Sequence, residues 1–583
     1  MWNSIEEILH ELNTEQQIAV QEEKNAVLIA CPGSGKTRTI VHRLAYLNLK
    51  YHESRKLNIA ITYTNRAAEE MERRLNDLCI EQNNIWTGTI HKFCMEFVIR
   101  PYFMYSERLR YGYRIIDEYE KLEYGKKIAD ELGISVKYNK YFENQDIVKR
   151  YKENLIKNQE IDFDDILIES ITLLRDYKFI SENISSIIRS VMVDEYQDTN
   201  EIQYQLLAKL YSSNPMMNIM FVGDPNQAIY STLGGVAKTV KQISALFGVG
   251  FQELLLSGCY RSTQRVIDFY SEYAVRKVSV RSCSEYASER GVIAYLKNLD
   301  TSQLASAISV IIKREIMQGI EPNEICVAAP QWSYLFDLSK KLRNVLPDLD
   351  FDAPEIVPFK YDPMNPFYLI AWLTFTESGR LEHLRKRRAT EILSIFKFDF
   401  GIYIPERFDN LSLLSSINRS CMSSNQNDGI ELYKMIIRNI FKEINVEIEN
   451  EHALKQCYEA FIEKTENRVR QFHLLTSTSD LKTCFKEKKG VVITTIHAMK
   501  GEEYHSVIAF GLLNGILPNW NDIIDRPLLR KDITYRLLFV LISRAKKNIF
   551  LISENGRKTN KGNPYCPTDE LQTLRFALDN YYI

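Results

Sequence analysis

Residues 26–47 hold the feature that most limits how this chain can fold: an apolar run, a glycine-rich turn and a helical repeat in direct succession. Residues 26–29 read as a strand, residues 30–37 have the sequence ACPGSGKT, and apolar residues then recur at helical spacing. Such a turn lets backbone N–H groups close around phosphates, while Lys36 reaches the β- and γ-phosphates and Thr37 can ligate Mg²⁺. The pattern predicts a P-loop; the alternative is a plain glycine turn entering a helix.

Two more predicted strands end in polar residues. Residues 188–193 lead into Asp194 and Glu195, and residues 219–222 lead into a polar segment, 223–230, that contains Gln227. Two adjacent acids downstream of a P-loop suit a Mg²⁺ ligand followed by a carboxylate that orients the attacking water, although an acidic strand end can also be a solvated turn. Three such strands predict one parallel sheet with an ATPase site at its carboxyl edge.

The remaining strands are predicted further along the chain. Residues 325–329, 491–497, 507–510 and 549–552 are apolar and favour a second parallel sheet. Two stretches, roughly 97–183 and 359–484, are helical in pattern, rich in charge and without a catalytic constellation. We interpret both stretches as insertions.

Composition narrows the classes of partner. The 583 residues carry 74 Lys plus Arg against 76 Asp plus Glu, so a nucleic acid would have to be bound locally in a groove. No apolar run is long enough to span a membrane, and residues 1–7 lack a secretory pattern, so we expect a cytoplasmic protein without membrane contact. The ten cysteines show no metal-binding spacing, and we expect them reduced and mostly buried.

The order of motifs resembles the UvrD, Rep and PcrA helicases of superfamily 1 over nearly the whole chain. Residues 12–17 are similar to the Q motif, and residues 30–38, 62–71 and 88–91 to motif I and the next two motifs. The later motifs correspond to residues 193–198, 223–230, 260–262, 495–503 and 536–545. Nine motifs in sequence with compatible spacing make a specific match.

The resemblance implies an α/β fold with two RecA-like P-loop domains, parallel sheets flanked by helices, each domain carrying a mostly helical insertion. The first domain would comprise residues 1–96 and 184–266, with its insertion at 97–183. The second would comprise residues 267–358 and 485–583, with a reduced insertion at 359–484. ATP would bind between the two domains, and a single DNA strand would lie across them.

The resemblance also implies the site residues. The catalytic set is Lys36, Asp194, Glu195, Gln227, Arg261 and Arg544. ATP would be bound by Gln16, Ala30, Cys31, Pro32, Gly33, Ser34, Gly35, Lys36, Thr37, Arg38, Tyr260 and Glu503, with Thr37 and Asp194 holding Mg²⁺. Nucleic acid would be bound by Thr62, Tyr63, Asn65, Thr89, His91, Tyr230, Thr495 and His497.

Two departures from the family pattern affect how tightly single-stranded DNA is expected to bind. Thr232 and Leu233 stand where the family usually has an aromatic residue and an arginine, and that aromatic residue stacks on a base. Losing the stack removes about 1–3 kcal/mol of binding per base. Tyr63 and Tyr230 remain as candidate stacking platforms, with buried tyrosines as the alternative interpretation.

The function implied is an ATP-dependent 3′-to-5′ helicase or translocase on single-stranded DNA or a 3′-tailed duplex. Because the insertions are short, the chain also resembles the UvrD-like subunit of the Gabija anti-phage defence system, which implies antiviral defence with a partner nuclease. The alternative function is a DNA-sensing ATPase subunit that recruits or activates a nuclease and unwinds little. A basic stretch, residues 380–388, reads as a solvated helix face or as a contact for duplex or partner.

Overall fold

The computed structural model describes residues 5–78, 84–136, 140–230, 234–353, 357–362, 364–377, 379–424, 426–486, 489–559 and 561–582. Cys79, Thr232 and Leu233 lie outside these residues. The chain forms two compact units. Unit 1 comprises Met1–Ile90, Ser181–Ala353 and Lys488–Ile583, and unit 2 comprises His91–Ile180 and Pro354–Glu487. The finer division into four domain segments stays a prediction.

The first sheet of unit 1 contains the P-loop strand. Among the described residues it has six strands in the order β3 (Ile85–Thr89), β2 (Leu57–Thr62), β6 (Ile188–Val193), β7 (Asn218–Gly223), β1 (Ala26–Ala30) and β8 (Gln252–Leu256). Every neighbouring pair is parallel. All five residues of β1 are buried, as expected for a parallel strand covered on both faces.

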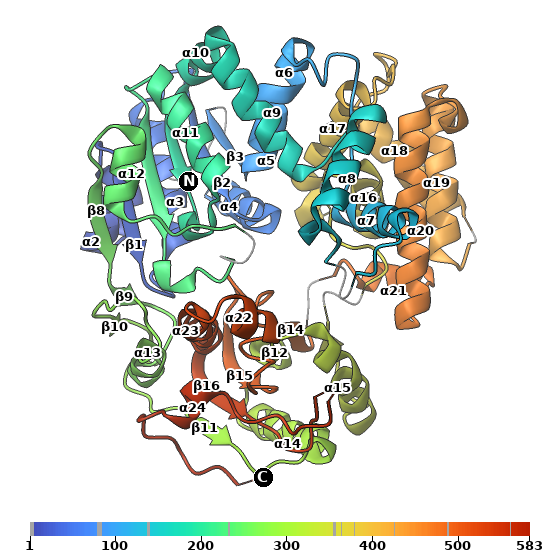
Figure 1. Cartoon of the computed structure of the whole chain (residues 1–583). Helices are drawn as coiled ribbons and strands as arrows, with labels where there is room; N and C mark the ends of the chain where they lie inside the picture. The colour runs from blue at the N-terminus through green and yellow to red at the C-terminus, as the bar shows by residue number, and fades with distance from the viewer. Residues whose placement is uncertain are drawn as a thin grey trace. The chain divides into compact units, whose positions relative to one another are not determined.

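Helices flank this sheet. They are α1 (Ile5–His10), α2 (Thr14–Gln21), α3 (Lys36–Lys50), α4 (Asn65–Asp77), α11 (Glu201–Ser213) and α12 (Val240–Phe247) (Figure 1). The apolar repeat after the P-loop is the buried face of α3, where Ile40, Val41 and Leu44 join the core cluster that contains Leu28 of β1. The predicted succession of strand, glycine loop and helix is therefore present.

The second sheet of unit 1 has the same architecture. Its six described strands are ordered β11 (Ile293–Leu296), β16 (Ala545–Ile552), β15 (Tyr504–Ala509), β12 (Ile325–Ala329), β14 (Val491–Thr495) and β13 (Phe351–Asp352), all parallel (Figure 1). The helices of this part are α13 (Gln264–Ser271), α14 (Leu304–Met317), α15 (Trp332–Val345), α22 (Trp520–Asp525), α23 (Arg530–Ile542) and α24 (Asp569–Gln572). Two six-stranded parallel sheets with flanking helices confirm the predicted fold class.

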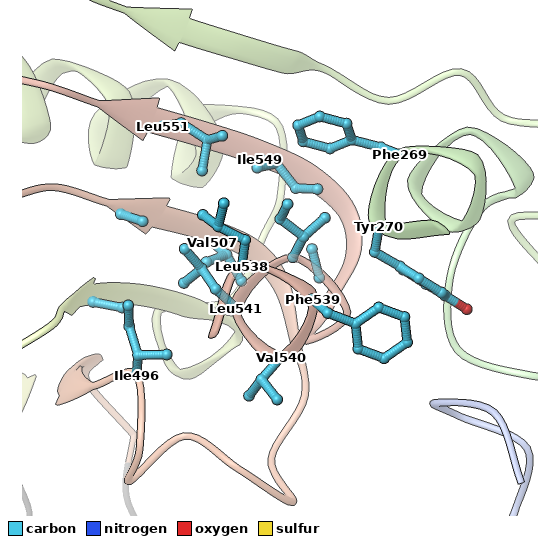
Figure 2. Packing of buried hydrophobic residues seen from close by; sticks show 14 of the residues in the cluster. Phe269, Tyr270, Ile496, Val507, Leu538, Phe539, Val540, Leu541, Ile549 and Leu551 are labelled. Carbon is cyan, nitrogen blue, oxygen red and sulfur yellow. The ribbon is translucent and has the colours of Figure 1, made fainter. Parts of the chain in front are cut away.

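Helix α23 is the centre of the largest apolar cluster beside the second sheet. Leu538 and Leu541 pack with Val507 of β15 and Ile549 of β16, and the ring of Phe539 lies 5.0 Å from that of Tyr270 on α13 (Figure 2). This packing fixes the C-terminal end of α23. Arg544, two residues beyond that end, is thereby held beside this core.

Unit 2 is mostly helical. Its helices include α6 (Arg100–Tyr102), α7 (Glu118–Leu132), α8 (Gln145–Lys157) and α9 (Phe163–Asp176), together with α16 (Pro366–Phe375), α17 (Glu382–Phe398), α18 (Asn410–Ser423), α19 (Gly429–Glu443), α20 (His452–Phe472) and α21 (Thr478–Thr483). Helix α5 (Ile90–Phe93) begins one residue before unit 2, and α10 (Lys178–Ser186) ends beyond its first segment. The short strands β4 (Arg114–Ile115) and β5 (Glu160–Ile161) pair with each other.

Ion pairs join the two chain segments of unit 2. Lys92 Nζ lies 2.6 Å from Glu391 Oε1, and Arg100 donates to both carboxylate oxygens of Asp399 at 2.8 and 2.6 Å. Two segments more than 250 residues apart in the sequence are thus tied together inside one unit.

The basic stretch at 380–388 differs from the predicted solvated face. Arg385 is buried and donates to the carbonyl oxygens of Leu373 and Thr376 at 2.7 and 2.5 Å, and buried Arg388 lies 3.9 Å over the ring of Trp372. Only part of the stretch, including Lys386, is exposed. The prediction is wrong for these two arginines because they cap and cover α16.

Two further expectations can be compared with the structure. The nine described cysteines form no disulfide with one another, and Cys31, Cys94, Cys259 and Cys326 are buried while the others are partly or fully exposed. Within the described residues, none of the helices combines the length and apolar character that crossing a bilayer requires.

Candidate nucleotide and nucleic-acid sites

The P-loop follows β1 and has the backbone that phosphate binding requires. Gly33 and Gly35 adopt left-handed conformations with φ of 72° and 82°, and helix α3 starts directly after Gly35. A Cβ atom on Gly33 would lie 2.6 Å from the Cβ of Arg261, so the loop tolerates only glycine there. The buried hydroxyl of Ser34 has no hydrogen-bond partner among the described residues.

Two acids follow β6 at the same edge of the sheet. The backbone N–H of Asp194 donates to the carbonyl of Ile61 at 2.8 Å, and Glu195 has a left-handed φ of 51°. Glu195 Oε1 lies 3.1 Å from Lys36 Nζ. The structure therefore brings the P-loop lysine and both acids together.

Burial and neighbouring charges shift the pKa values of the two acids apart. It raises the pKa of Asp194, and the neighbouring Glu195 carboxylate raises that pKa further. Burial acts on Glu195 as well, but Lys36 and Lys500 outweigh it and lower the pKa of Glu195. Burial would also lower the pKa of Lys36, yet Glu195, Asp224 and Asp194 together raise it. The pKa values of the two adjacent acids are therefore shifted in opposite directions.

Arg544 reaches the first sheet from the second. Its Nη2 donates to Gln227 Oε1 at 2.7 Å, and Gln227 Nε2 donates to Asp224 Oδ2 at 2.8 Å. Burial, followed by the positive charge of Arg261, lowers the pKa of Arg544 to about 9. Arg261 is itself held by Glu503, with Nε 2.8 Å from Oε2.

Lys500 lies beside the acids of the candidate ATP site, a position that the sequence did not predict. Its Nζ forms an ion pair with Asp198, donates to the carbonyl of Gln227 at 2.9 Å, lies 3.9 Å from Glu195 Oε2 and lies 5.2 Å over the Tyr230 ring. Burial raises the pKa of Asp198 to about 6 despite this cation. Lys500 lies in the motif at residues 495–503, which was the available signal, but sequence spacing alone gives no distance to Asp198.

The residues predicted to bind the base lie beside the P-loop. Gln16 Nε2 donates to the carbonyl of Ser34 at 3.0 Å, and its backbone N–H donates to Asn13 Oδ1 in a capping box. The half-exposed Tyr260 accepts a hydrogen bond from Asn13 Nδ2 at 2.5 Å. Exposed Arg38 donates to the carbonyl of Glu11 at 2.8 Å.

Several residues predicted to contact DNA lie at the carboxyl ends of parallel β-strands. Thr62 and Thr89 are register partners at the carboxyl ends of β2 and β3, Thr495 ends β14, and Asn65 begins α4. The Tyr63 and Tyr230 rings stack at 5.0 Å, and the Tyr63 side chain is 39% exposed. Tyr63 is therefore available as a stacking platform, contrary to the alternative of a buried tyrosine.

The two motif histidines lie in different units. His497 is beside Tyr230, with ring centroids 6.0 Å apart, and Tyr230 Oη donates to the His497 carbonyl at 3.2 Å. His91 belongs to unit 2, where its ring contacts Phe163 edge-on at 5.6 Å. Burial lowers the pKa of both rings, so both are neutral at pH 7.

The residues present fit a nucleotide with Mg²⁺. The glycine cradle, the unpartnered Ser34 hydroxyl and a lysine whose described partner is a carboxylate supply an anion site, and Thr37 with Asp194 offers hard oxygen ligands. Among the described residues no group of three His, Cys, Asp or Glu side chains could hold a metal by itself. Such a site would depend on phosphate oxygens for its remaining ligands.

Comparison with known families agrees with this geometry. The model of the UvrD/REP helicase N-terminal domain matches residues 12–143 and 135–248, and the UvrD-like helicase C-terminal domain matches residues 387–556. Together the two models cover well over half of the chain.

Known relatives match this chain over most of their own length. The ATP-dependent DNA helicase PcrA of Bacillus subtilis (strain 168) is 23% identical over 94% of this chain and 84% of its own length. The ATP-dependent DNA helicase Rep of Buchnera aphidicola subsp. Acyrthosiphon pisum is 25% identical over 92% of this chain and 94% of its own length. With both domain models matched in order, the chain belongs to the UvrD/Rep/PcrA-like helicases of superfamily 1.

Proposed function

We propose that this chain is an ATP-dependent helicase that moves 3′ to 5′ on single-stranded DNA. The observation that carries the proposal is the hydrogen bond from Arg544 to Gln227, which joins the second sheet to the P-loop side of the first. An ATPase whose cationic groups come from both sheets can couple hydrolysis to movement of one sheet against the other.

Each site residue has a role in this proposal. Lys36 would bind the β- and γ-phosphates, and Thr37 with Asp194 would hold Mg²⁺, which supplies positive charge to the phosphates when bound. Glu195 would orient the attacking water and accept its proton, a role that suits an ionised carboxylate. Arg261 and Arg544 would stabilise negative charge that develops on the γ-phosphate.

Binding of the base and of the strand completes the proposal. Gln16, Arg38, Tyr260 and Glu503 would surround the nucleoside, and the backbone of residues 30–35 would surround the phosphates. Thr62, Asn65, Thr89 and Thr495 would contact the strand, Tyr63 and Tyr230 would stack on bases, and His497 would lie beside them; a role for His91 in binding nucleic acid stays a prediction.

The decisive experiment measures ATP hydrolysis with and without single-stranded DNA, together with strand separation of 3′-tailed and 5′-tailed duplexes. Stimulated hydrolysis with unwinding of the 3′-tailed duplex alone supports the proposal. Unwinding of the 5′-tailed duplex alone would contradict the direction, and no hydrolysis with either DNA would contradict the ATPase assignment.

A second candidate is a DNA-sensing ATPase subunit that serves a partner nuclease in anti-phage defence, as the Gabija resemblance implies. The observation that favours a protein partner is a group of exposed apolar side chains close together in the sequence, Trp520, Ile524, Leu528 and Leu529, of which Leu528 is 96% exposed. Stimulated hydrolysis without unwinding, and a stoichiometric nuclease that co-purifies with wild type but not with Leu528→Asp, would favour this function.

A further inference from the structure

The turn between β14 and β15 connects the side of unit 1 predicted to bind DNA with the two arginines of the ATP site. This connection comprises residues 496–503 and ends with Gly501, Glu502 and Glu503, of which Gly501 has a left-handed φ of 88°. The Glu502 carboxylate forms an ion pair with Arg66, and the adjacent Glu503 carboxylate holds Arg261 at 2.8 Å. Two successive side chains therefore point to two different functional surfaces.

Arg66 belongs to the surface predicted to contact a strand. It follows Asn65 in the first turn of α4, close after Tyr63, and its side chain is 66% exposed while that of Glu502 is 30% exposed. A guanidinium binds a phosphodiester by the same forked geometry with which it binds a carboxylate. Glu502 therefore binds the Arg66 guanidinium, the same group that would bind a phosphate of the DNA backbone.

The same turn touches the second arginine through its backbone. Arg544 Nη1 lies 3.5 Å from the Glu502 carbonyl, and Arg544 Nη2 holds Gln227. A movement of Glu502 would therefore displace Glu503, which binds Arg261. It would also displace the Glu502 carbonyl oxygen, which contacts Arg544.

We propose that Glu502 competes with the DNA backbone for Arg66, and that its release by a phosphodiester frees Arg261 and Arg544 for the ATP site. The Arg66–Glu502 ion pair then restrains both DNA binding and DNA-independent hydrolysis. This inference rests on the proposed function, because it assumes that DNA binds on the Arg66 side.

The size of the effect follows from the exposure of the pair. Exposed ion pairs are worth at most about 1 kcal/mol, which corresponds to a change of about fivefold in an equilibrium constant. Salt screens such pairs, so the restraint should fade as ionic strength rises.

The test compares Glu502→Gln with the wild-type chain. Binding of a fluorescein-labelled oligo(dT) is followed by anisotropy at low and high salt, and ATP hydrolysis is measured without DNA. We expect Glu502→Gln to bind about two- to fivefold more tightly at low salt, to lose this advantage at high salt, and to hydrolyse ATP faster without DNA. Equal binding at low salt would overturn the inference.

Asp77→Asn is the matched control. It removes one negative charge from an exposed ion pair, with Arg73, on the same helix α4. If Asp77→Asn tightened binding as much as Glu502→Gln, general electrostatics would explain the result and the inference would be wrong.

The double variant Arg66→Glu with Glu502→Arg tests the pair itself. We expect it to restore slow hydrolysis without DNA, because the ion pair forms again with its charges exchanged. Additive effects of the two substitutions would contradict the coupling. A wild-type chain that binds oligo(dT) but does not hydrolyse ATP would refute the proposed function, while the binding comparison would still decide this inference.

Discussion

Unit 1 and unit 2 use charged side chains in different ways. In unit 2 several cations have carboxylate partners of their own: Arg114 lies between Glu120 and Glu160, and Lys121 contacts Asp162 and Asp164. In the site of unit 1 the cations share partners. Lys36 and Lys500 both approach Glu195, and Lys500 and Arg544 both bind Gln227.

The difference teaches how to separate structural charge from functional charge. A cation with its own carboxylates is fixed, so its loss should change stability. Cations that share one acid have spare donors for a further anion, so their loss should change chemistry.

The largest expected effect is that of Lys36→Ala. We expect ATP turnover to fall by at least about 10²- to 10³-fold, because the phosphates lose a charged donor. Glu195→Gln should abolish turnover equally but keep nucleotide binding, since it leaves the glycine loop and Lys36 in place. Steady-state hydrolysis and binding of a fluorescent ATP analogue measure the two effects, and retained turnover in either variant would refute the assignment.

Arg544→Ala comes next. We expect kcat to fall by about 10²-fold with a much smaller change in nucleotide affinity, because a transition-state contact is removed. Arg544→Lys keeps the charge but loses the forked donors, and should recover only part of the rate. Equal losses of kcat and affinity would show that Arg544 merely binds the ground state.

The strand, glycine loop and helix of the P-loop could be predicted because that pattern is local in the sequence. Lys36, Thr37, Asp194 and Glu195 lie at strand ends that the apolar pattern marks, and β1, β6, β7 and β12 appear within two residues of their predicted limits. Strands β2, β3, β8, β11 and β13 of the two sheets were not foreseen; β8 is largely exposed and β13 has two residues.

Contacts between distant segments could not be predicted in the same way. Lys500 with Asp198 and Arg66 with Glu502 are pairs separated by hundreds of residues, and no periodicity encodes them. The sequence predicted an exposed helix face for Arg385 and Arg388, which are buried. A run of basic residues does not show which buried groups its side chains contact. Thr232 and Leu233 lie outside the described residues, so their effect on base stacking stays a prediction.

Arg100→Ala tests the structural side of the comparison. It leaves the mostly buried Asp399 carboxylate without its partner, and we expect the free energy of unfolding to fall by about 3 kcal/mol. Urea denaturation measures the loss, and hydrolysis without DNA should stay within about twofold of wild type. A large loss of hydrolysis with unchanged stability would break the distinction between the two units.

The pH dependence of stability tests Asp198. Its pKa is raised to about 6 from 3.8, so between these values the folded state binds more protons than the unfolded state. Stability relative to Asp198→Asn should therefore rise as pH falls, by about 1.4 kcal/mol between pH 8 and pH 5. Thermal unfolding of both proteins across this range checks the sign, and a difference that shrinks with falling pH would contradict it.

The smallest effect is expected from Lys386→Ala in the basic stretch. Lys386 is exposed and forms an (i, i+4) pair with Glu382 at 2.7 Å, so its removal should cost no more than about 0.5 kcal/mol of stability. Arg385→Ala, one position earlier, strips buried carbonyl oxygens of their donor and should cost about 2 kcal/mol. If Lys386 instead contacts duplex DNA, Lys386→Ala should weaken binding and reduce its salt dependence by about one counterion, because each phosphate contact releases one. Unchanged binding together with the contrast in stability would show that this stretch stabilises unit 2, with its charge incidental to nucleic-acid recognition.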